Sequence, residues 1–213
     1  MTTLHGAMTP SRAERTATMI AWARDYLSAP YPGPGFTRTG AICPYVSRMV
    51  AEDKMNVLLA EGVDGTDYEP VLRAALEAAG HALRTIAPGI IDTALVLGFP
   101  DLPDDRAEDL LNRLEEALVK PMLAVHMMVA TTCQVPGSSP EDPWPKGASS
   151  PMPTLVLRRL GPWDAVFMQS EHFARTHHGV YLDWYLTGRM TPQNARTFEE
   201  MCARHDLPLV APA

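Results

Sequence analysis

The chain has 213 residues, 46% hydrophobic content and a formal net charge of −7. This length and apolar content can bury one sizeable core and favour a single domain over residues 1–213. The acidic balance argues against nucleic acid and anionic membranes as partners, since both attract clustered cations, so we expect a small-molecule substrate.

Neither a membrane span nor a secretion signal is visible. No apolar run reaches the roughly 18 residues that a membrane span needs. The first residues lack the apolar core of a signal peptide, so we expect a cytoplasmic protein. The three cysteines, Cys43, Cys133 and Cys202, are odd in number and widely spaced. They predict free thiols rather than a disulfide framework or a CxxC metal knuckle.

The N-terminal part of the chain predicts a tail, a helix and a strand. Residues 1–10 are expected to form the tail. Ser11 and Glu14 have the spacing of a capping box, which predicts a helix from this point. Prolines and glycines between residues 30 and 35 end that helix. Residues 54–61 (KMNVLLAE) predict the first strand.

A second helix is predicted between residues 66 and 87. Thr66 and Glu69 again have capping-box spacing, and Pro70 suits a first helical turn. The following Pro-Gly pair at residues 88–89 stops the helix. The expected inward face consists of Leu72, Ala75, Leu76, Ala79, Leu83 and Ile86.

The stretch from residue 92 to 133 predicts strand, helix and strand. Residues 93–99 are continuously apolar and too few for a helix, which is typical of a central strand covered on both faces. Between residues 104 and 120, apolar residues recur at spacings of three and four and predict an amphipathic helix that ends at Pro121. Residues 122–133 are apolar again and predict the next strand.

The C-terminal part adds a loop, a strand and two helices. Residues 135–153 contain six prolines and predict a long loop that is either a lid or poorly ordered. Residues 154–160 (TLVLRRL) predict a strand. Helices are expected after Ser170 and from Thr191. The chain therefore predicts an α+β fold with a roughly four-stranded sheet, helices packed on it and a long proline-rich loop.

Cys43 is the first residue that could perform chemistry. It precedes Pro44 in a segment whose prolines and glycines favour a rigid turn. A thiolate is a strong nucleophile and metal ligand, and Arg38 or Arg48 could lower its pKa. A Cys-Pro pair is also a way to present an axial thiolate to haem. The alternative is a small buried side chain in a tight turn.

Histidines form the other candidates. On a strand over residues 122–133, His126 would share a face with Met122, Ala124, Met128 and Ala130 and point into an apolar space. The alternative is a core histidine bonded to one carbonyl.

The helix predicted after Ser170 carries several titratable groups. Glu171, Arg175 and His178 would lie on one side of it, and His177 on the apolar side. Only one of the adjacent histidines can point fully inward. The alternative is a solvated face with a Glu171–Arg175 pair. The spacing of these histidines does not suit zinc.

Common catalytic motifs do not occur in the sequence. It has no GxGxxG after a strand, no GxxxxGK[ST], no GxSxG and no HExxH. Standard nucleotide, hydrolase and zinc-protease chemistry are therefore disfavoured.

Three segments carry a resemblance to a known family: GAICPYV (40–46), LVLGFPD (95–101) and SPMPTLVLR (150–158). In these blocks the chain resembles the DUF6875 domain, an uncharacterised bacterial family often found near natural-product biosynthesis genes. The resemblance covers about residues 20 to 185. It implies a single domain in which the CP turn, the FPD turn and the SPxP strand are shared features.

Two classes of function are open. The first is a haem-dependent oxidoreductase that tailors a small molecule in natural-product biosynthesis. The second is a cofactor-free protein that binds or rearranges a small apolar molecule in a hydrophobic pocket. A homodimer is compatible with either class.

The haem hypothesis assigns a role to each candidate residue. Cys43 would bind the iron, with His126 or His177 as the alternative axial ligand. Further cofactor contacts would come from Pro44, Tyr45 and Arg158. The expected catalytic residues are His126, His177, His178 and Arg175.

Overall fold

A computed structural model describes residues 10–28, 43, 45–133, 150–162, 164–165 and 171–210. Along the chain the elements are α1 (Arg12–Trp22), a π-helical turn η1 (Ala23–Leu27), α2 (Val46–Ala51), β1 (Met55–Leu59), α3 (Tyr68–Thr85), β2 (Ala94–Gly98), α4 (Asp104–Leu123), β3 (Met127–Thr132), β4 (Thr154–Arg159), α5 (Glu171–Leu186) and α6 (Pro192–Arg204). The predicted α+β class is confirmed, with six α-helices and four strands in the described ranges.

The sheet is mixed, with the strand order β1-β2-β4-β3. β1 and β2 are parallel, and β4 is antiparallel to both of its neighbours, so β3 runs in the direction of β2. α3 and α4 are therefore crossovers between parallel strands, and β4 is inserted between β2 and β3. All five residues of β2 are buried, which confirms the predicted central strand.

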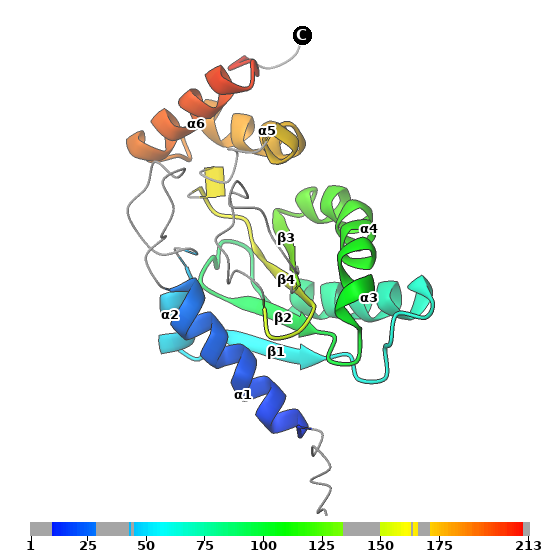
Figure 1. The fold of residues 1–213 in the computed structure, drawn as a ribbon. Coiled ribbons are helices and arrows are strands. Elements are labelled where there is room, and N and C mark those ends of the chain that lie inside the picture. Colours follow the sequence, from blue (N-terminus) through cyan, green and yellow to red (C-terminus); the bar gives the residue numbers. More distant parts are fainter. Residues whose placement is uncertain are drawn as a thin grey trace, which may run out of the picture.

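Each face of the sheet is covered by different helices. Leu95 and Leu97 of β2 belong to the large core that also contains residues of α3 and α4. Ala94 and Val96 project to the opposite face, because side chains alternate along a strand. There they pack with residues of α1 and α2. Figure 1 shows α1 and α2 on one side of the sheet, α3 on the other, and α5 and α6 beyond one end of the strands.

The boundary between α4 and β3 differs from the prediction. α4 continues through Pro121 to Leu123, and β3 starts only at Met127. A proline after the first turn of a helix costs an intrahelical hydrogen bond, because it has no N–H to donate to the carbonyl four residues earlier. Burial of Met122 and Leu123 against the core offsets it. His126 consequently lies in the turn before β3, exposed and with a φ of 56°, not on a strand facing an apolar space.

The inward face of α3 was also predicted wrongly in part. Its N-cap is Asp67, without a side-chain cap, so the expected capping box of Thr66 and Glu69 is absent. Leu76 and Leu83 are 53% and 40% exposed. The side chains that α3 buries are mostly small: Val71, Ala75, Ala78, Ala79 and Ala82. Small side chains let the helix axis approach the sheet closely, which turns the larger leucines outward.

Other predicted boundaries are confirmed. Ser11 and Glu14 form the capping box of α1. Thr191 caps α6, with Pro192 in the first turn. The predicted N-terminal tail, Pro44, Ser170 and most of the proline-rich loop lie outside the described residues. None of the helices in the described ranges is long and apolar enough to cross a membrane.

Candidate functional site

A small cavity lies between α1, η1, α2 and the sheet face that these helices cover. Its volume is about 40 Å³. Among the described residues the lining is apolar except at three side chains, those of Trp22, Cys43 and Arg158. The remaining lining residues are Met19, Leu27, Val46, Met49, Met55, Ala94, Val96 and Val156. Two residues of the haem hypothesis, Cys43 and Arg158, are thus brought to one cavity.

Backbone contacts explain how Cys43 reaches this cavity. Its N–H donates to the carbonyl oxygen of Leu27 at 2.8 Å, which ties it to the end of η1. Its own carbonyl oxygen accepts from the N–H of Val46, at the start of α2. Cys43 is therefore held between the two helical segments that form one wall. The opposite wall is the sheet, where alternation places Val156 and Arg158 of β4 on the same side.

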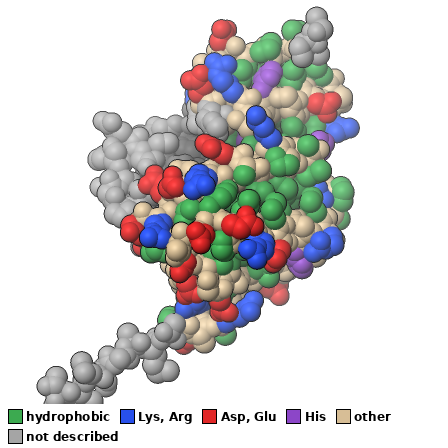
Figure 2. Space-filling model, turned by 90° about the vertical axis from the view of Figure 1, so that its right-hand side faces the viewer, with side chains coloured by type: hydrophobic (Ala, Val, Ile, Leu, Met, Phe, Trp, Pro, Cys, Tyr) green, Lys and Arg blue, Asp and Glu red, His purple; other side chains and the backbone are tan. Residues whose placement is uncertain are grey.

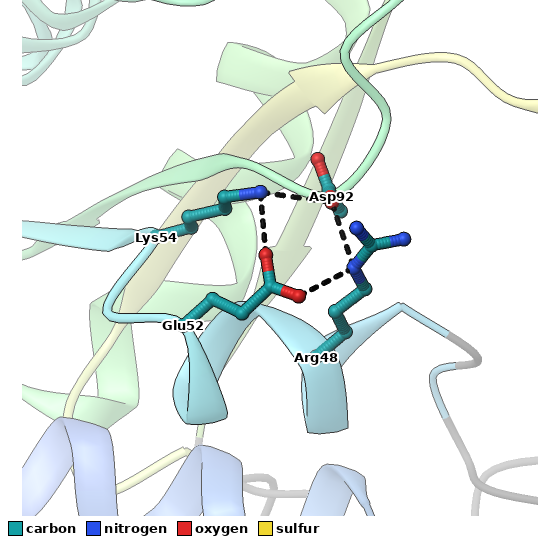
Figure 3. A network of polar contacts seen from close by, with 4 residues as sticks. All are labelled: Arg48, Glu52, Lys54 and Asp92. Carbon is teal, nitrogen blue, oxygen red and sulfur yellow. Dashed lines mark hydrogen bonds and ion pairs between the residues drawn. The ribbon is translucent and has the colours of Figure 1, made fainter.

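A network of four charged side chains fixes α2 against the sheet (Figure 3). Glu52, next to the C-terminus of α2, accepts from Arg48 at 2.7 Å and pairs with Lys54 at 2.6 Å. Asp92, which precedes β2, pairs with Arg48 at 3.0 Å and with Lys54 at 3.1 Å. Hydrogen bonds from Lys54 lower the pKa of both carboxyl groups. Each acid bridges the same two cations, so the network joins α2 to the ends of β1 and β2.

Arg158 forms a buried ion pair with Asp164. The side chains are 4% and 0% exposed. Nη1 of Arg158 donates to Oδ2 of Asp164 at 2.8 Å, and Nη2 donates to Oδ1. Burial opposes the charge of Arg158, but the Asp164 carboxylate outweighs it and raises the pKa of the guanidinium. Asp164 also accepts from the N–H of Gly161 at 2.7 Å, so the turn after β4 holds the acid in place.

Tyr45 lies beside this ion pair. Its ring is 4.5 Å from the guanidinium carbon of Arg158, within the range of a cation–π contact. The Tyr45 hydroxyl lies against the Cα of Gly161, where a methyl group would overlap it. Arg158 is also close enough to Cys43 and Tyr45 for electrostatic interaction. The structure therefore groups Cys43, Tyr45 and Arg158, as the haem hypothesis required.

Tyr181 of α5 lies close enough to Asp164, Arg158 and Tyr45 for electrostatic interaction. It is fully buried, and its hydroxyl has no hydrogen-bond partner in the described part of the chain. Burial, followed by the nearby Asp164 carboxylate, raises the pKa of Tyr181 well above its ordinary value. The phenol therefore stays neutral, and its O–H is an unused donor.

Tyr181→Phe tests the cost of this unused donor. A buried hydroxyl without a partner costs about 1 to 3 kcal/mol. We therefore expect the variant to be as stable as the parent or more stable, by up to about 2 kcal/mol in urea unfolding. A loss of more than 1 kcal/mol would show that the hydroxyl has a partner, for example an internal water molecule.

The predicted histidine cluster lies elsewhere. His177 is buried in α5, with Nδ1 at 3.0 Å from the carbonyl oxygen of Phe173 and its ring stacked on that phenyl ring. His178 contacts the carbonyl oxygen of Pro208 at 2.7 Å. Arg175 is exposed and pairs with Glu171 at 2.8 Å, as the alternative reading predicted. Only His177 points fully inward, which confirms the expectation for the adjacent histidines.

The predicted residues thus do not assemble into one site. His126 packs against Trp184 in a T-shaped arrangement, with 5.7 Å between ring centroids. Neither it nor the α5 residues His177, His178 and Arg175 line the cavity at Cys43. In the described ranges, no group of three or more His, Cys, Asp or Glu side chains could hold a metal ion.

Sequence reasoning missed three residues of the site. Trp22, Asp164 and Tyr181 were not singled out. One signal was available: two adjacent arginines in the strand TLVLRRL must place charge on both faces of a buried sheet. Such charges are almost always paired, so an acid in the following turn was to be expected.

A porphyrin does not fit the cavity as it stands. Pockets for small molecules and cofactors usually have volumes of about 300–1,000 Å³. The cavity at Cys43 has about 40 Å³. The apolar lining and the sulfur of Cys43 would suit a porphyrin chemically. A porphyrin could enter this cavity only if the surrounding helices moved apart.

The fold and site define an α+β protein with a small apolar cavity on one sheet face and a buried Arg-Asp pair at its wall. The family model described as "Domain of unknown function (DUF6875)" matches residues 16–197, and the chain belongs to this family. The resemblance seen in the sequence is thereby confirmed. Neither a curated protein nor a solved structure matches the chain.

Proposed function

We propose that the chain binds a compact, mainly apolar small molecule in the cavity at Cys43 and Arg158. The observation that supports this most strongly is the chemical character of the lining. Among the described lining residues, Trp22 and Arg158 carry nitrogen donors, an indole N–H and a guanidinium, and no described lining side chain carries an oxygen acceptor. Nε1 of Trp22 is buried and has no hydrogen-bond partner among the described residues.

The donors indicate which ligand the cavity would accept. A ligand that offers a hydrogen-bond acceptor satisfies the buried Trp22 N–H, whereas a pure hydrocarbon leaves it unpaired. The charge of Arg158 is already balanced by Asp164. A carboxylate would therefore bring an uncompensated charge into an apolar cavity, which is costly. A neutral carbonyl compound of a few heavy atoms, such as a ketone, aldehyde or amide, is the best match.

Butanone and propionate test this proposal, because they have the same number of heavy atoms but differ in charge. We expect butanone to shift the Trp22 indole N–H signal saturably in an NMR titration, with Trp22→Phe identifying the signal. Propionate should bind at least tenfold more weakly. Val156→Phe fills the cavity and should abolish the butanone shift, whereas Val125→Phe, at an exposed turn position, should not. A folded protein without any saturable shift would contradict the proposal.

The same argument predicts a reversal of preference in one variant. Asp164→Asn keeps the shape of the side chain but leaves the charge of Arg158 unbalanced. Propionate should then bind better than butanone. An unchanged preference would show that Arg158 does not contact the ligand.

Haem-dependent oxidation of a small biosynthetic intermediate is a second proposal. It is supported by the position of Cys43, whose side chain lines an apolar, methionine-rich cavity with a cation nearby. A bound haem would supply one-electron and oxygen chemistry. This proposal requires α1 and η1 to move away from the sheet, because the present cavity is too small.

An absorption spectrum distinguishes the two proposals. Protein produced with a haem precursor should show a porphyrin band if the second proposal holds. Cys43→Ser should then shift the band or release the haem, because a serine oxygen is a poorer donor to ferric iron. A colourless preparation without saturable haem titration would remove the haem proposal and leave the first one standing.

A further inference from the structure

The outward face of α3 carries large apolar side chains that the fold leaves uncovered. Leu76 and Leu83 are 53% and 40% exposed. They are seven residues apart, about two helical turns, and so lie on the same side of the helix. Gly80 lies between them on that side and adds no side chain to the helix surface.

Hydrophobic side chains also gather elsewhere on this side of the molecule. Figure 2 shows the face on the side of α3 and α4, with hydrophobic side chains in its middle and charged ones around them. α3 also forms one wall of a groove of about 570 Å³ whose other wall includes the edge strand β1. Contiguous apolar surface of this kind, with a polar rim, is typical of protein–protein contact sites.

Two opposite charges flank the leucines of α3. Glu77 and Arg84 both line the groove, and neither forms an ion pair in the described part of the chain. They are seven residues apart, about 10 Å along the axis, and so cannot pair with each other. By contrast, Arg73 on the same helix pairs with Glu69. On α3 itself the groove therefore presents one acid and one base without an ion pair among the described residues, and they have the same seven-residue spacing as the two leucines; Arg12 and His81 also line the groove.

We propose that this face binds a second copy of the chain, with the two α3 helices packed antiparallel across a two-fold axis near Gly80. A two-fold axis places the same surface on both sides, so the surface must complement itself. With the axis at this point, Leu76 of one copy meets Leu83 of the other, and Glu77 meets Arg84. Each contact occurs twice.

Gly80 fits the same arrangement. A glycine inside a helix costs about 1 kcal/mol relative to alanine, so it needs a compensating role. At the crossing point of two helices it allows the axes to approach closely. In the part of the chain that the structure describes, a side chain at this position would meet only the end of Arg84. Packing within one copy therefore does not require the glycine, whereas the dimer does.

Analytical ultracentrifugation with a charge swap tests the dimer. The parent chain should dimerise, and Glu77→Arg or Arg84→Glu alone should raise the dimer dissociation constant at least tenfold, since each creates two repulsive pairs. The double variant Glu77→Arg/Arg84→Glu should restore dimerisation. Arg196→Glu on α6 makes the same charge change outside this face and should have no effect.

All three substituted side chains are exposed, so circular dichroism should show unchanged folding. A parent chain that stays monomeric over the concentration range would overturn the proposal. An unchanged dimer dissociation constant in Glu77→Arg would also overturn it. So would a double variant whose dissociation constant is as high as those of the single variants. Because the experiment measures association alone, its result is independent of ligand binding in the cavity.

Discussion

Asp164→Ala is expected to lower the free energy of unfolding by about 3 to 5 kcal/mol, the usual result of removing one partner from a buried ion pair. Arg158 would keep its charge in a place where it is 4% exposed, and the N–H of Gly161 would lose its acceptor. Urea unfolding at neutral pH measures the loss. Asp183→Ala provides the matched control, because Asp183 pairs with Arg189 at the surface and such pairs contribute about 0 to 1 kcal/mol.

Removing both partners of the ion pair should lower the free energy of unfolding less than removing Asp164 alone. In the double variant Arg158→Met/Asp164→Ala, no buried charge is left without a partner. We expect it to recover most of the stability lost in Asp164→Ala, since apolar replacements of buried ion pairs are often neutral. A double variant that is less stable than Asp164→Ala would mean that Arg158 stabilises the fold through its contact with Tyr45 rather than through Asp164.

Arg159→Met should destabilise the protein by about 3 kcal/mol or more. Arg159 projects to the opposite face from Arg158, and it donates to two backbone carbonyl oxygens. Ile86 follows the C-terminus of α3, and Val125 lies in the turn after α4. Removal of the guanidinium leaves the buried carbonyl oxygen of Ile86 unpaired and takes the donor from the partly buried carbonyl oxygen of Val125. Hydrogen bonds to charged groups contribute about 1.5 to 3 kcal/mol each.

The measurement for Arg159 combines urea unfolding with hydrogen exchange. Arg175→Met is the control, because Arg175 is exposed and pairs only with Glu171. Faster exchange at the last turns of α3 and α4 should accompany the loss of stability. Equal stability of Arg159→Met and the parent would show that water replaces the guanidinium at these carbonyls.

Most of the secondary structure could be predicted because its causes are local. The apolar run at residues 93–99 contains β2, and the residues with three-and-four apolar spacing after residue 104 form α4. The capping box of Ser11 and Glu14 lies at the start of α1, as predicted. The family blocks also placed Cys43, Tyr45 and Arg158 in one hypothesis, and the fold brings these three together. Periodicity and capping act within a few residues, so they can be read without knowing the fold.

What the sequence alone could not decide depends on contacts between distant segments. Whether Leu76 or Ala78 of α3 faces the sheet depends on how closely the helix approaches it, and the apolar periodicity wrongly placed Leu76 on the inward face. Whether α4 continues past Pro121 depends on the burial of Met122 and Leu123 against the core. That Asp164 is the acid that balances Arg158 was decided by the turn after β4, which folds back onto the strand. Local patterns therefore determined the elements of this protein, whereas packing between elements decided which side chains became core, ion pair, cavity wall and exposed face.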